Sequence, residues 1–286
     1  MLTDIQGIQV GNWTDRDAAT GCTVVIFPEG TVASGEIRGG APATRDFSLL
    51  HPSRIVDRID AVVLSGGSAY GLAACEGVMD FLEKRGQGFP TASGNVPIVV
   101  GMSLFDLNQG DPQKRPGVEE GKKAAASASS SKTEVGLVGA GTGATISKWC
   151  GKENAKPGGI GVASCQSGDL IVAALFAVNA SGDIDDGMAR ESIANGTFVF
   201  PEVLPFENTT IGVVATNARL SKSECFLASQ SAHDGFAKAI FPAHTQSDGD
   251  AVVVAATGSV DASVGTVRLL ATVAVEKAIR SVTNYT

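Results

Sequence analysis

A pair of hydroxyl-bearing residues, Thr209 and Thr210, follows Asn208 where a proline-containing stretch meets an apolar segment. A threonine hydroxyl can act as a nucleophile only if a base lies beside it to take its proton. The sequence alone does not identify such a base. By itself this segment predicts the start of a buried strand with a hydroxyl close to it.

Two carboxylates, those of Asp248 and Asp250, flank Gly249 directly before another apolar segment. Side chains two residues apart on an extended chain point to the same side, so both carboxylates face one way at the edge of the predicted strand. This arrangement suits orienting a hydroxyl or an ammonium group, or binding a metal ion. A solvated turn is the alternative interpretation.

A third candidate is the glycine-rich turn 66–71, which contains Ser68 and lies between a predicted strand and a predicted helix. It nearly matches the G-x-S-x-G elbow that exposes a nucleophilic serine, except that Tyr70 occupies the position of the second glycine. The remaining members of a triad follow in the order of a serine hydrolase: Asp183 or Asp185, then His233 or His244. The alternative is a sharp turn whose backbone N–H groups face a ligand.

Three further patterns do not fit the sites that they resemble. The run 139–144 lacks the glycine spacing and the downstream acidic residue of a dinucleotide loop, so we expect a tight turn there. The run 183–187 carries its glycine one position late for a calcium loop, which favours an ordinary acidic turn. The five cysteines are scattered without a C-x-x-C pair, which excludes a disulfide scaffold and a standard zinc site. We expect neither a metal nor a cofactor.

Apolar segments must position these groups. Continuous apolar runs predict buried strands in the ranges 23–27, 61–64, 170–178, 211–216 and 251–256. Helical patterns follow the turn at Ser68 and Pro116, and Ser221 with Glu224 forms a capping box that starts a helix to about Ile240. A last helix is expected from Val264 to Ala278. Because strands that are apolar on both faces must be covered, we predict sheets layered with helices in one α/β or α+β domain.

The composition is that of a globular protein, with 43% hydrophobic and 18% charged residues among 286. A net charge of −8 argues against a nucleic-acid binder and against a protein of anionic membrane surfaces. No apolar run approaches the roughly 20 residues of a membrane-spanning helix. The first seven residues lack the basic region and apolar core of a signal peptide. We therefore expect a soluble, cytoplasmic protein that binds neither nucleic acid nor membranes.

Six motifs occur in order along nearly the whole chain, in the ranges 38–45, 64–72, 141–149, 178–183, 208–217 and 244–258. Together they resemble the family of self-cleaving amide hydrolases that includes L-aminopeptidase/D-esterases, β-peptidyl aminopeptidases and endo-acting nylon-oligomer hydrolases. The resemblance implies a four-layer α-β-β-α sandwich, similar to N-terminal nucleophile hydrolases but connected differently. It also implies homo-oligomers, as tetramers or larger assemblies.

The same resemblance implies a precursor that cuts its own chain between Asn208 and Thr209. The single domain 1–286 would then consist of an α chain, 1–208, and a β chain, 209–286. Thr209 would be both the nucleophile and the new N-terminus. A free α-amino group has a pKa of about 7.7–8.0, so near neutrality it can take the proton of the neighbouring hydroxyl, which an amide nitrogen cannot do.

Supporting roles are implied by the resemblance as well. Asn179 and Tyr70 are expected to donate hydrogen bonds to the oxyanion of the tetrahedral intermediate. Lys148 is expected to lower the pKa of the free amine or to stabilise developing negative charge. The substrate would be a small peptide or another amide, including β-peptides or ω-amino-acid oligomers.

Asp248 and Asp250 match acidic positions of the nylon-hydrolase branch and would orient the hydroxyl and amine of Thr209. Gly67 and Ser68 are expected to contact the substrate. Two alternative functions remain at this stage. One is a serine hydrolase centred on Ser68, and the other is a non-enzymatic ligand-binding protein that keeps the fold.

Overall fold

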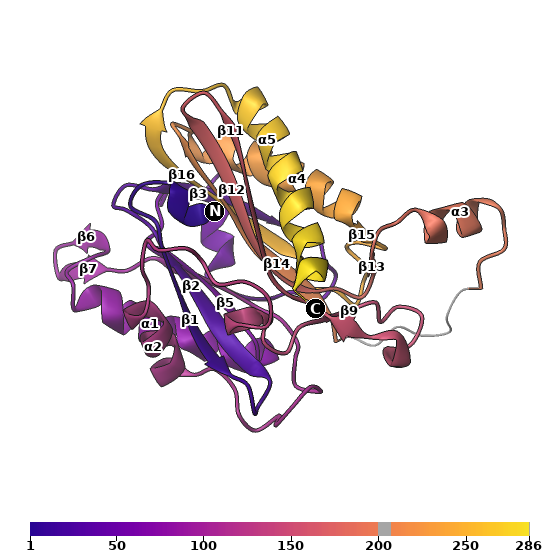
Figure 1. Ribbon diagram of the computed structural model, residues 1–286. Coiled ribbons are helices and arrows are strands. Elements are labelled where there is room, and N and C mark those ends of the chain that lie inside the picture. The colour runs from indigo at the N-terminus through magenta and orange to yellow at the C-terminus, as the bar shows by residue number, and fades with distance from the viewer. Residues whose placement is uncertain (200–206, 286) are drawn as a thin grey trace.

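Two five-stranded sheets form the centre of the molecule (Figure 1), for which a computed structural model describes residues 1–199 and 207–285. The first sheet has the order β1 (Gln9–Asp15), β2 (Thr20–Ile26), β5 (Ala61–Ser65), β8 (Val99–Ser103) and β4 (Ala43–Arg45). The second has the order β11 (Gly159–Ser167), β12 (Leu170–Asn179), β14 (Thr209–Ala218), β16 (Ala251–Val260) and β3 (Val32–Ile37).

Helices cover the outer face of each sheet. On the first sheet lie α1 (Ala74–Glu83) and α2 (Val118–Ala126), and on the second lie α4 (Lys222–Ala239) and α5 (Val264–Arg280) (Figure 1). The layers therefore run helix, sheet, sheet, helix, which confirms the predicted four-layer α-β-β-α sandwich. In the described ranges, none of the helices is long and apolar enough to cross a membrane.

Shorter elements connect the layers. The helix α3 (Met188–Ala194) projects away from the sandwich (Figure 1). Two-stranded ribbons are formed by β6 (Phe89–Thr91) with β7 (Gly94–Val96), β9 (Thr145–Ile146) with β10 (Lys156–Pro157), and β13 (Asp183–Ile184) with β15 (Ile240–Phe241).

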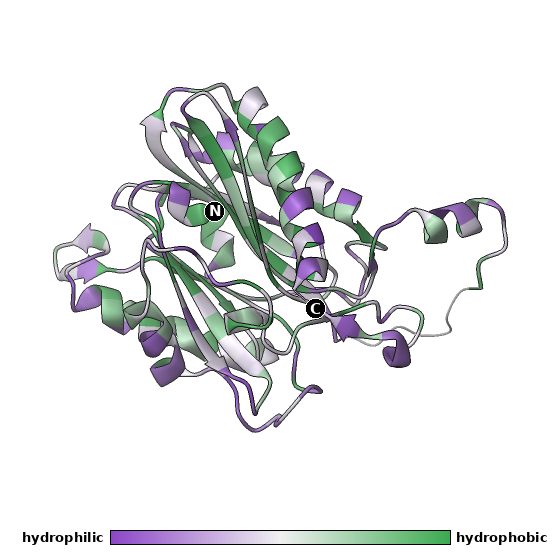
Figure 2. Cartoon of the chain, viewed as in Figure 1, coloured by the Kyte–Doolittle hydropathy of each residue, from purple (hydrophilic) through white to green (hydrophobic). Residues whose placement is uncertain are grey.

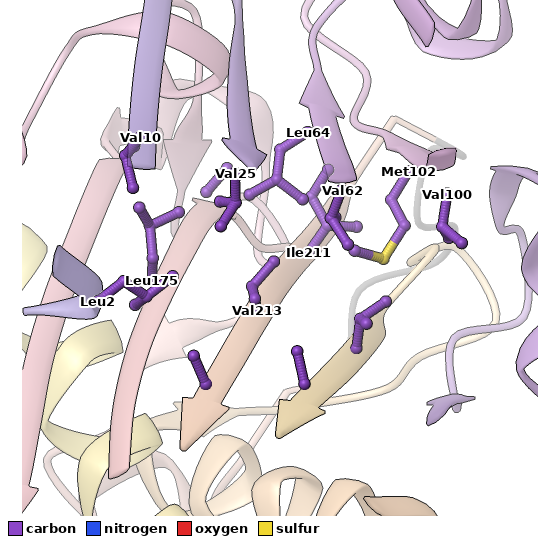
Figure 3. Close-up of a cluster of buried hydrophobic side chains, with 14 of the residues drawn as sticks. Leu2, Val10, Val25, Val62, Leu64, Val100, Met102, Leu175, Ile211 and Val213 are labelled. Carbon is purple, nitrogen blue, oxygen red and sulfur yellow. The ribbon is translucent and has the colours of Figure 1, made fainter. Parts of the chain in front are cut away.

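The main apolar core lies between the two sheets. Figure 3 shows Val25 and Leu64 of the first sheet facing Leu175, Ile211 and Val213 of the second. Two further cores separate each sheet from its helices. Successive side chains of a strand point to opposite faces, so a strand such as β14 must be apolar on both. This explains why the central strands are largely hydrophobic in Figure 2.

The elements follow the sequence prediction closely. The apolar run 61–64 is β5, which continues through a 3-10 helix, η3 (Ser68–Ala73), into α1. The capping box at the start of α4 is present, because Glu224 N–H donates to the hydroxyl of Ser221 at 3.3 Å and Ser221 N–H donates to the Glu224 carboxylate at 2.8 Å. Most of the predicted proline-containing linker, 201–208, lies outside the described residues.

Candidate active site

The candidate site lies at one end of the second sheet, where three neighbouring strands end or begin. β12 and β14 are antiparallel, and their register places Asn179, the last residue of β12, opposite Thr209, the first of β14. β14 and β16 are parallel, so they begin at the same end, with Ile211 opposite Ala251. Asp250, which directly precedes β16, therefore lies beside the first residues of β14.

The hydroxyl of Thr209 is in contact with the peptide bond that precedes it. It donates to the carbonyl oxygen of Asn208 and accepts a hydrogen bond from the backbone N–H of Gly249 at 3.1 Å. Both residues of the Asn208–Thr209 peptide bond are buried: Asn208 has 3% and Thr209 has 4% of its surface exposed. The oxygen that could attack the Asn208 carbonyl is thus held beside it in a site closed to solvent.

Gly249 allows this contact because it has no side chain. A Cβ at this position would lie 2.6 Å from the Thr209 hydroxyl oxygen and 2.8 Å from the carbonyl oxygen of Ala41. Any other residue would displace either the hydroxyl or the loop. The sequence pattern indicated the two flanking carboxylates but gave no role to the backbone N–H of Gly249. A glycine between two aspartates before a strand could have indicated a close approach of the backbone.

The two carboxylates accept hydrogen bonds from neighbouring segments of the chain. Asp250 accepts a hydrogen bond from the backbone N–H of Thr210 at 2.8 Å. Asp248 accepts one from the N–H of Ser181 at 3.1 Å and another from the hydroxyl of Thr245. Within the described residues, neither carboxylate hydrogen-bonds to the Thr209 hydroxyl in the uncut chain, so their predicted action on it stays a prediction.

Burial changes the pKa of Asp248, one member of this acidic pair. Asp248 and Asp250 are 2% and 1% exposed. Burial, together with the negative charge of Asp250, raises the pKa of Asp248 to about 7. Hydrogen bonds from Thr245 and Ser181 and the positive charge of Lys148 act in the opposite direction. Asp248 can therefore change its charge near neutral pH.

Lys148 and Asn179 form a second buried pair at the same place. The ammonium of Lys148 donates to the side-chain carbonyl of Asn179 at 3.0 Å, and the Asn179 side-chain amide donates to the backbone carbonyl of Phe105 at 2.9 Å. Burial lowers the pKa of Lys148 to about 7, partly offset by the negative charges of Asp248 and Glu207. The side chain can therefore exchange a proton near neutral pH.

The predicted substrate contacts, Gly67 and Ser68, lie in the turn that follows β5 of the first sheet, and one segment, 104–106, connects this turn to the cluster. Gly67 N–H donates to the carboxylate of Asp106 at 2.7 Å, and Ser68 N–H donates to the carbonyl of Leu104 at 2.9 Å. Phe105 lies between Leu104 and Asp106, and its backbone carbonyl accepts the hydrogen bond from the Asn179 side chain described above. The turn is thus adjacent to the candidate site, and its contact with substrate stays a prediction.

Tyr70 is the predicted residue that the structure does not bring into the cluster. Its side chain is 63% exposed, and its ring lies 4.0 Å from the guanidinium carbon of Arg115. In the described part of the chain, the hydrogen bonds that surround Thr209 do not include it. Its expected role as an oxyanion donor is untested.

The alternative triad around Ser68 is not assembled in the described residues. His233 contacts the carbonyl of Glu36 and the ring of His244, and His244 contacts Asp250. The two acidic candidates also have other partners, because Asp183 accepts a hydrogen bond from the Trp149 indole and Asp185 pairs with Arg190. Both histidines belong instead to the surroundings of Thr209, a position that the sequence order did not predict.

Two cavities lie beside the segment that carries Lys148. One has a volume of about 380 Å³ and the other about 520 Å³, and Ser147, Lys156 and Asp183 line both. Trp149 lines the larger one, and its ring stacks on Phe198 with 4.9 Å between ring centroids. Across residues 1–199 and 207–285, no group of three or more His, Cys, Asp or Glu side chains could hold a metal ion.

Comparisons with known proteins show which family the chain belongs to. The family model of peptidase family S58 matches residues 1–286. An uncharacterized aminopeptidase of Mycobacterium leprae is 42% identical over 297 residues, which cover 92% of this chain and 80% of the relative. A 6-aminohexanoate-oligomer endohydrolase of Kocuria sp. is 28% identical over 278 residues, which cover 90% of this chain and 75% of that enzyme.

A solved structure shares the fold. The L-aminopeptidase D-Ala-esterase/amidase of Ochrobactrum anthropi, described as a new variant among the Ntn hydrolase fold, matches 99% of this chain and 85% of its own. The TM-score is 0.74 at 16% sequence identity, so this likeness concerns the fold. The family match extends over the whole chain and confirms the resemblance found in the sequence motifs. The chain therefore belongs to peptidase family S58, whose relatives here are aminopeptidases and amide hydrolases.

Proposed function

We propose that the chain is a self-processing amide hydrolase that cuts its own peptide bond between Asn208 and Thr209. The products are an α chain, 1–208, and a β chain, 209–286, which begins with the nucleophile. The observation that carries the proposal is the contact of the Thr209 hydroxyl with the Asn208 carbonyl oxygen, inside a buried cluster of polar groups.

The first reaction is an acyl shift within the chain. The hydroxyl oxygen of Thr209 attacks the carbonyl carbon of Asn208, the C–N bond breaks, and the hydroxyl proton ends on the departing nitrogen. This leaves an ester between Asn208 and the side chain of Thr209, with the α-amino group free. Water then hydrolyses the ester, which gives the carboxylate of Asn208 and restores the hydroxyl.

Buried neighbours support this step. Gly249 N–H holds the attacking oxygen, and Lys148 has a pKa of about 7 because of its burial, so part of it is a neutral amine near neutral pH. Such an amine can accept a proton and return it to the leaving nitrogen. Asn179 holds Lys148 in place through its side-chain carbonyl.

The second reaction uses the freed N-terminus on other amides. The α-amino group of Thr209 takes the proton of its own hydroxyl, the oxygen attacks the substrate carbonyl, and the leaving amine receives the proton. Water hydrolyses the resulting ester and releases the acid. In the uncut chain Thr209 is 4% exposed, so the cut both creates the base and opens the nucleophile to substrates.

The substrates of this proposal are small peptides or peptide-like amides. An uncharacterized aminopeptidase is the relative at 42% identity, whereas a relative at 28% identity is named for oligomers of 6-aminohexanoate, an ω-amino acid. The aminopeptidase likeness covers more of both chains. We therefore expect substrates with a free amino end to be the first to test, with β-peptides and ω-amino-acid oligomers beside them.

The test is the intact mass of the purified protein under denaturing conditions, followed over time. Wild type is expected to give two species that match 1–208 and 209–286. Thr209→Ala is expected to remain whole and inactive, Thr209→Ser to be cut, and Ser68→Ala to be cut normally. A cut one residue later would move the nucleophile to Thr210. Loss of activity in Ser68→Ala with normal activity in Thr209→Ala would overturn the proposal.

A further inference from the structure

Two histidines lie in a line behind Asp250 and connect it to the end of β3. The ring nitrogen Nδ1 of His244 is 2.9 Å from Oδ2 of Asp250, and its Nε2 is 3.3 Å from Nδ1 of His233. The other ring nitrogen of His233, Nε2, is 3.0 Å from the backbone carbonyl oxygen of Glu36. His233 is fully buried, and the ring of His244 packs on Phe236 with 4.5 Å between centroids.

The backbone of His244 is bent to serve the same contact. Its φ of 56° lies in the left-handed region, which residues other than glycine seldom adopt. In this conformation its backbone N–H donates to Oδ2 of Asp250 at 3.1 Å, the same oxygen that its ring approaches. A residue held in a rarely adopted conformation so that two of its groups meet one carboxylate oxygen indicates a constraint on that carboxylate.

The positions of the protons along this line follow from counting donors. A backbone carbonyl only accepts, so Nε2 of His233 carries a proton. Burial lowers the pKa of His233 to about 3, so the ring is neutral and its Nδ1 must accept. Nε2 of His244 therefore donates to it. One further proton is then needed between Nδ1 of His244 and Asp250.

That last proton belongs on the histidine. Asp250 also accepts the backbone N–H groups of Thr210 and His244, so three N–H donors converge on it when His244 Nδ1 is protonated. Several donors favour the ionised form of a carboxyl group, because each hydrogen bond stabilises its negative charge. The carboxylate thus keeps its charge and the imidazole keeps the proton.

We propose that His244 is protonated on both ring nitrogens and forms an ion pair with the buried Asp250, with His233 as the neutral acceptor that enforces this state. His244 is then a positioning residue for the Thr209 nucleophile. Its positive charge compensates the negative charge of Asp250, so that of the two carboxylates only Asp248 changes its charge beside Lys148. The kinetic consequence rests on the proposed function, whereas the protonation state does not.

Other charged side chains lie on the elements that pack against the two histidines and Asp250. Asp248 lies in the same loop, Glu36 and Arg38 lie at the end of β3, and Asp234 lies on α4. Arg38 pairs with Glu36 at 3.1 Å and approaches Asp234 at 3.9 Å. Those two carboxylates already have a cation beside them, which leaves Asp250 as the carboxylate that meets the His244 ring.

The direct test is nuclear magnetic resonance of the full chain labelled with ¹⁵N-histidine. The chain has three histidines, so His51→Gln and His244→Gln assign the three sets of ring signals. At about pH 8, where a free imidazole is neutral, His244 is expected to show two protonated ring nitrogens and His233 only one, Nε2. A single protonated nitrogen on His244 would overturn the proposal. Neither result depends on whether the chain cuts itself.

The second test is the pH dependence of self-cleavage in His244→Gln, with the exposed His51→Gln as the matched control. Glutamine can donate a hydrogen bond to Asp250 but cannot carry a positive charge. The repulsion between the carboxylates of Asp250 and Asp248 therefore increases, which raises the pKa of Asp248 further. The acidic limb of the profile is expected to move about one unit to higher pH, with a rate about tenfold lower near pH 7 and recovery near pH 9. An unchanged profile, or an equal loss at every pH, would contradict the ion pair.

Discussion

Replacing Gly249 by alanine tests the geometry of the nucleophile with one methyl group. The added Cβ would lie 2.6 Å from the Thr209 hydroxyl oxygen, whereas ordinary van der Waals contact begins at 3.4 Å. The carbonyl oxygen of Ala41, 2.8 Å away, hinders retreat of the loop. The hydroxyl must therefore move by about 0.8 Å or lose its hydrogen bond to the Gly249 N–H.

Either response is costly for the reaction. A misplacement of about 1 Å can lower a rate by about 10²-fold, and removal of one well-placed donor costs about 10²–10³-fold. We expect the rate of self-cleavage of Gly249→Ala to fall at least about 100-fold. Crowding of the loop costs about 1–3 kcal/mol of folding free energy, which lowers Tm by only a few degrees.

The assay follows the fraction of cut chain by denaturing mass spectrometry, with Tm measured on the same samples. Gly265→Ala is the matched control, because its Cβ would meet only the Ser263 hydroxyl at 3.8 Å, in the exposed first turn of α5. It is expected to cut as fast as wild type. If a folded Gly249→Ala also cut at the wild-type rate, the inferred geometry of the Thr209 hydroxyl would be refuted.

Three further perturbations test other parts of the molecule. Burial and the charge of Asp250 raise the pKa of Asp248 from 3.8 to about 7, so this group's contribution to folding stability falls as pH rises between these values. Asp248→Asn should remove that part of the pH dependence of Tm. Lys222→Met should lower stability by about 2–4 kcal/mol in a denaturant titration, because the ammonium donates to three backbone carbonyls that would lose their partner. Thr210→Val should leave the position of the cut unchanged in the mass spectrum and slow the cut no more than about tenfold, since the Thr210 hydroxyl accepts the Asn179 N–H.

Local patterns in the sequence determined most of the secondary structure. A continuous apolar strand such as 251–256 has no other stable place than between two layers, and it became β16. The capping box of Ser221 and Glu224 fixed the start of α4, because it satisfies N–H groups that a helix otherwise leaves unpaired. These features depend on neighbouring residues alone, and for that reason they can be predicted without a fold.

The family motifs also identified most of the candidate site. Thr209, Lys148, Asn179, Asp248 and Asp250 come from four separate segments, and the structure brings all five to one end of the second sheet. Composition and spacing would not have grouped them. The order of the motifs along the chain did so through resemblance.

Only the tertiary structure decided which groups meet inside this site. The sequence offered His233 and His244 as partners of Ser68, but the packing of α4 against β3 and the loop before β16 places both behind Asp250. Gly249 gained its role from the parallel pairing of β14 and β16, which brings its N–H to the Thr209 hydroxyl. The contacts of His233 with His244 and Glu36, and of Gly249 with Thr209, join residues 11 to 197 positions apart. No local pattern encodes them, because they exist only once the sheets have paired.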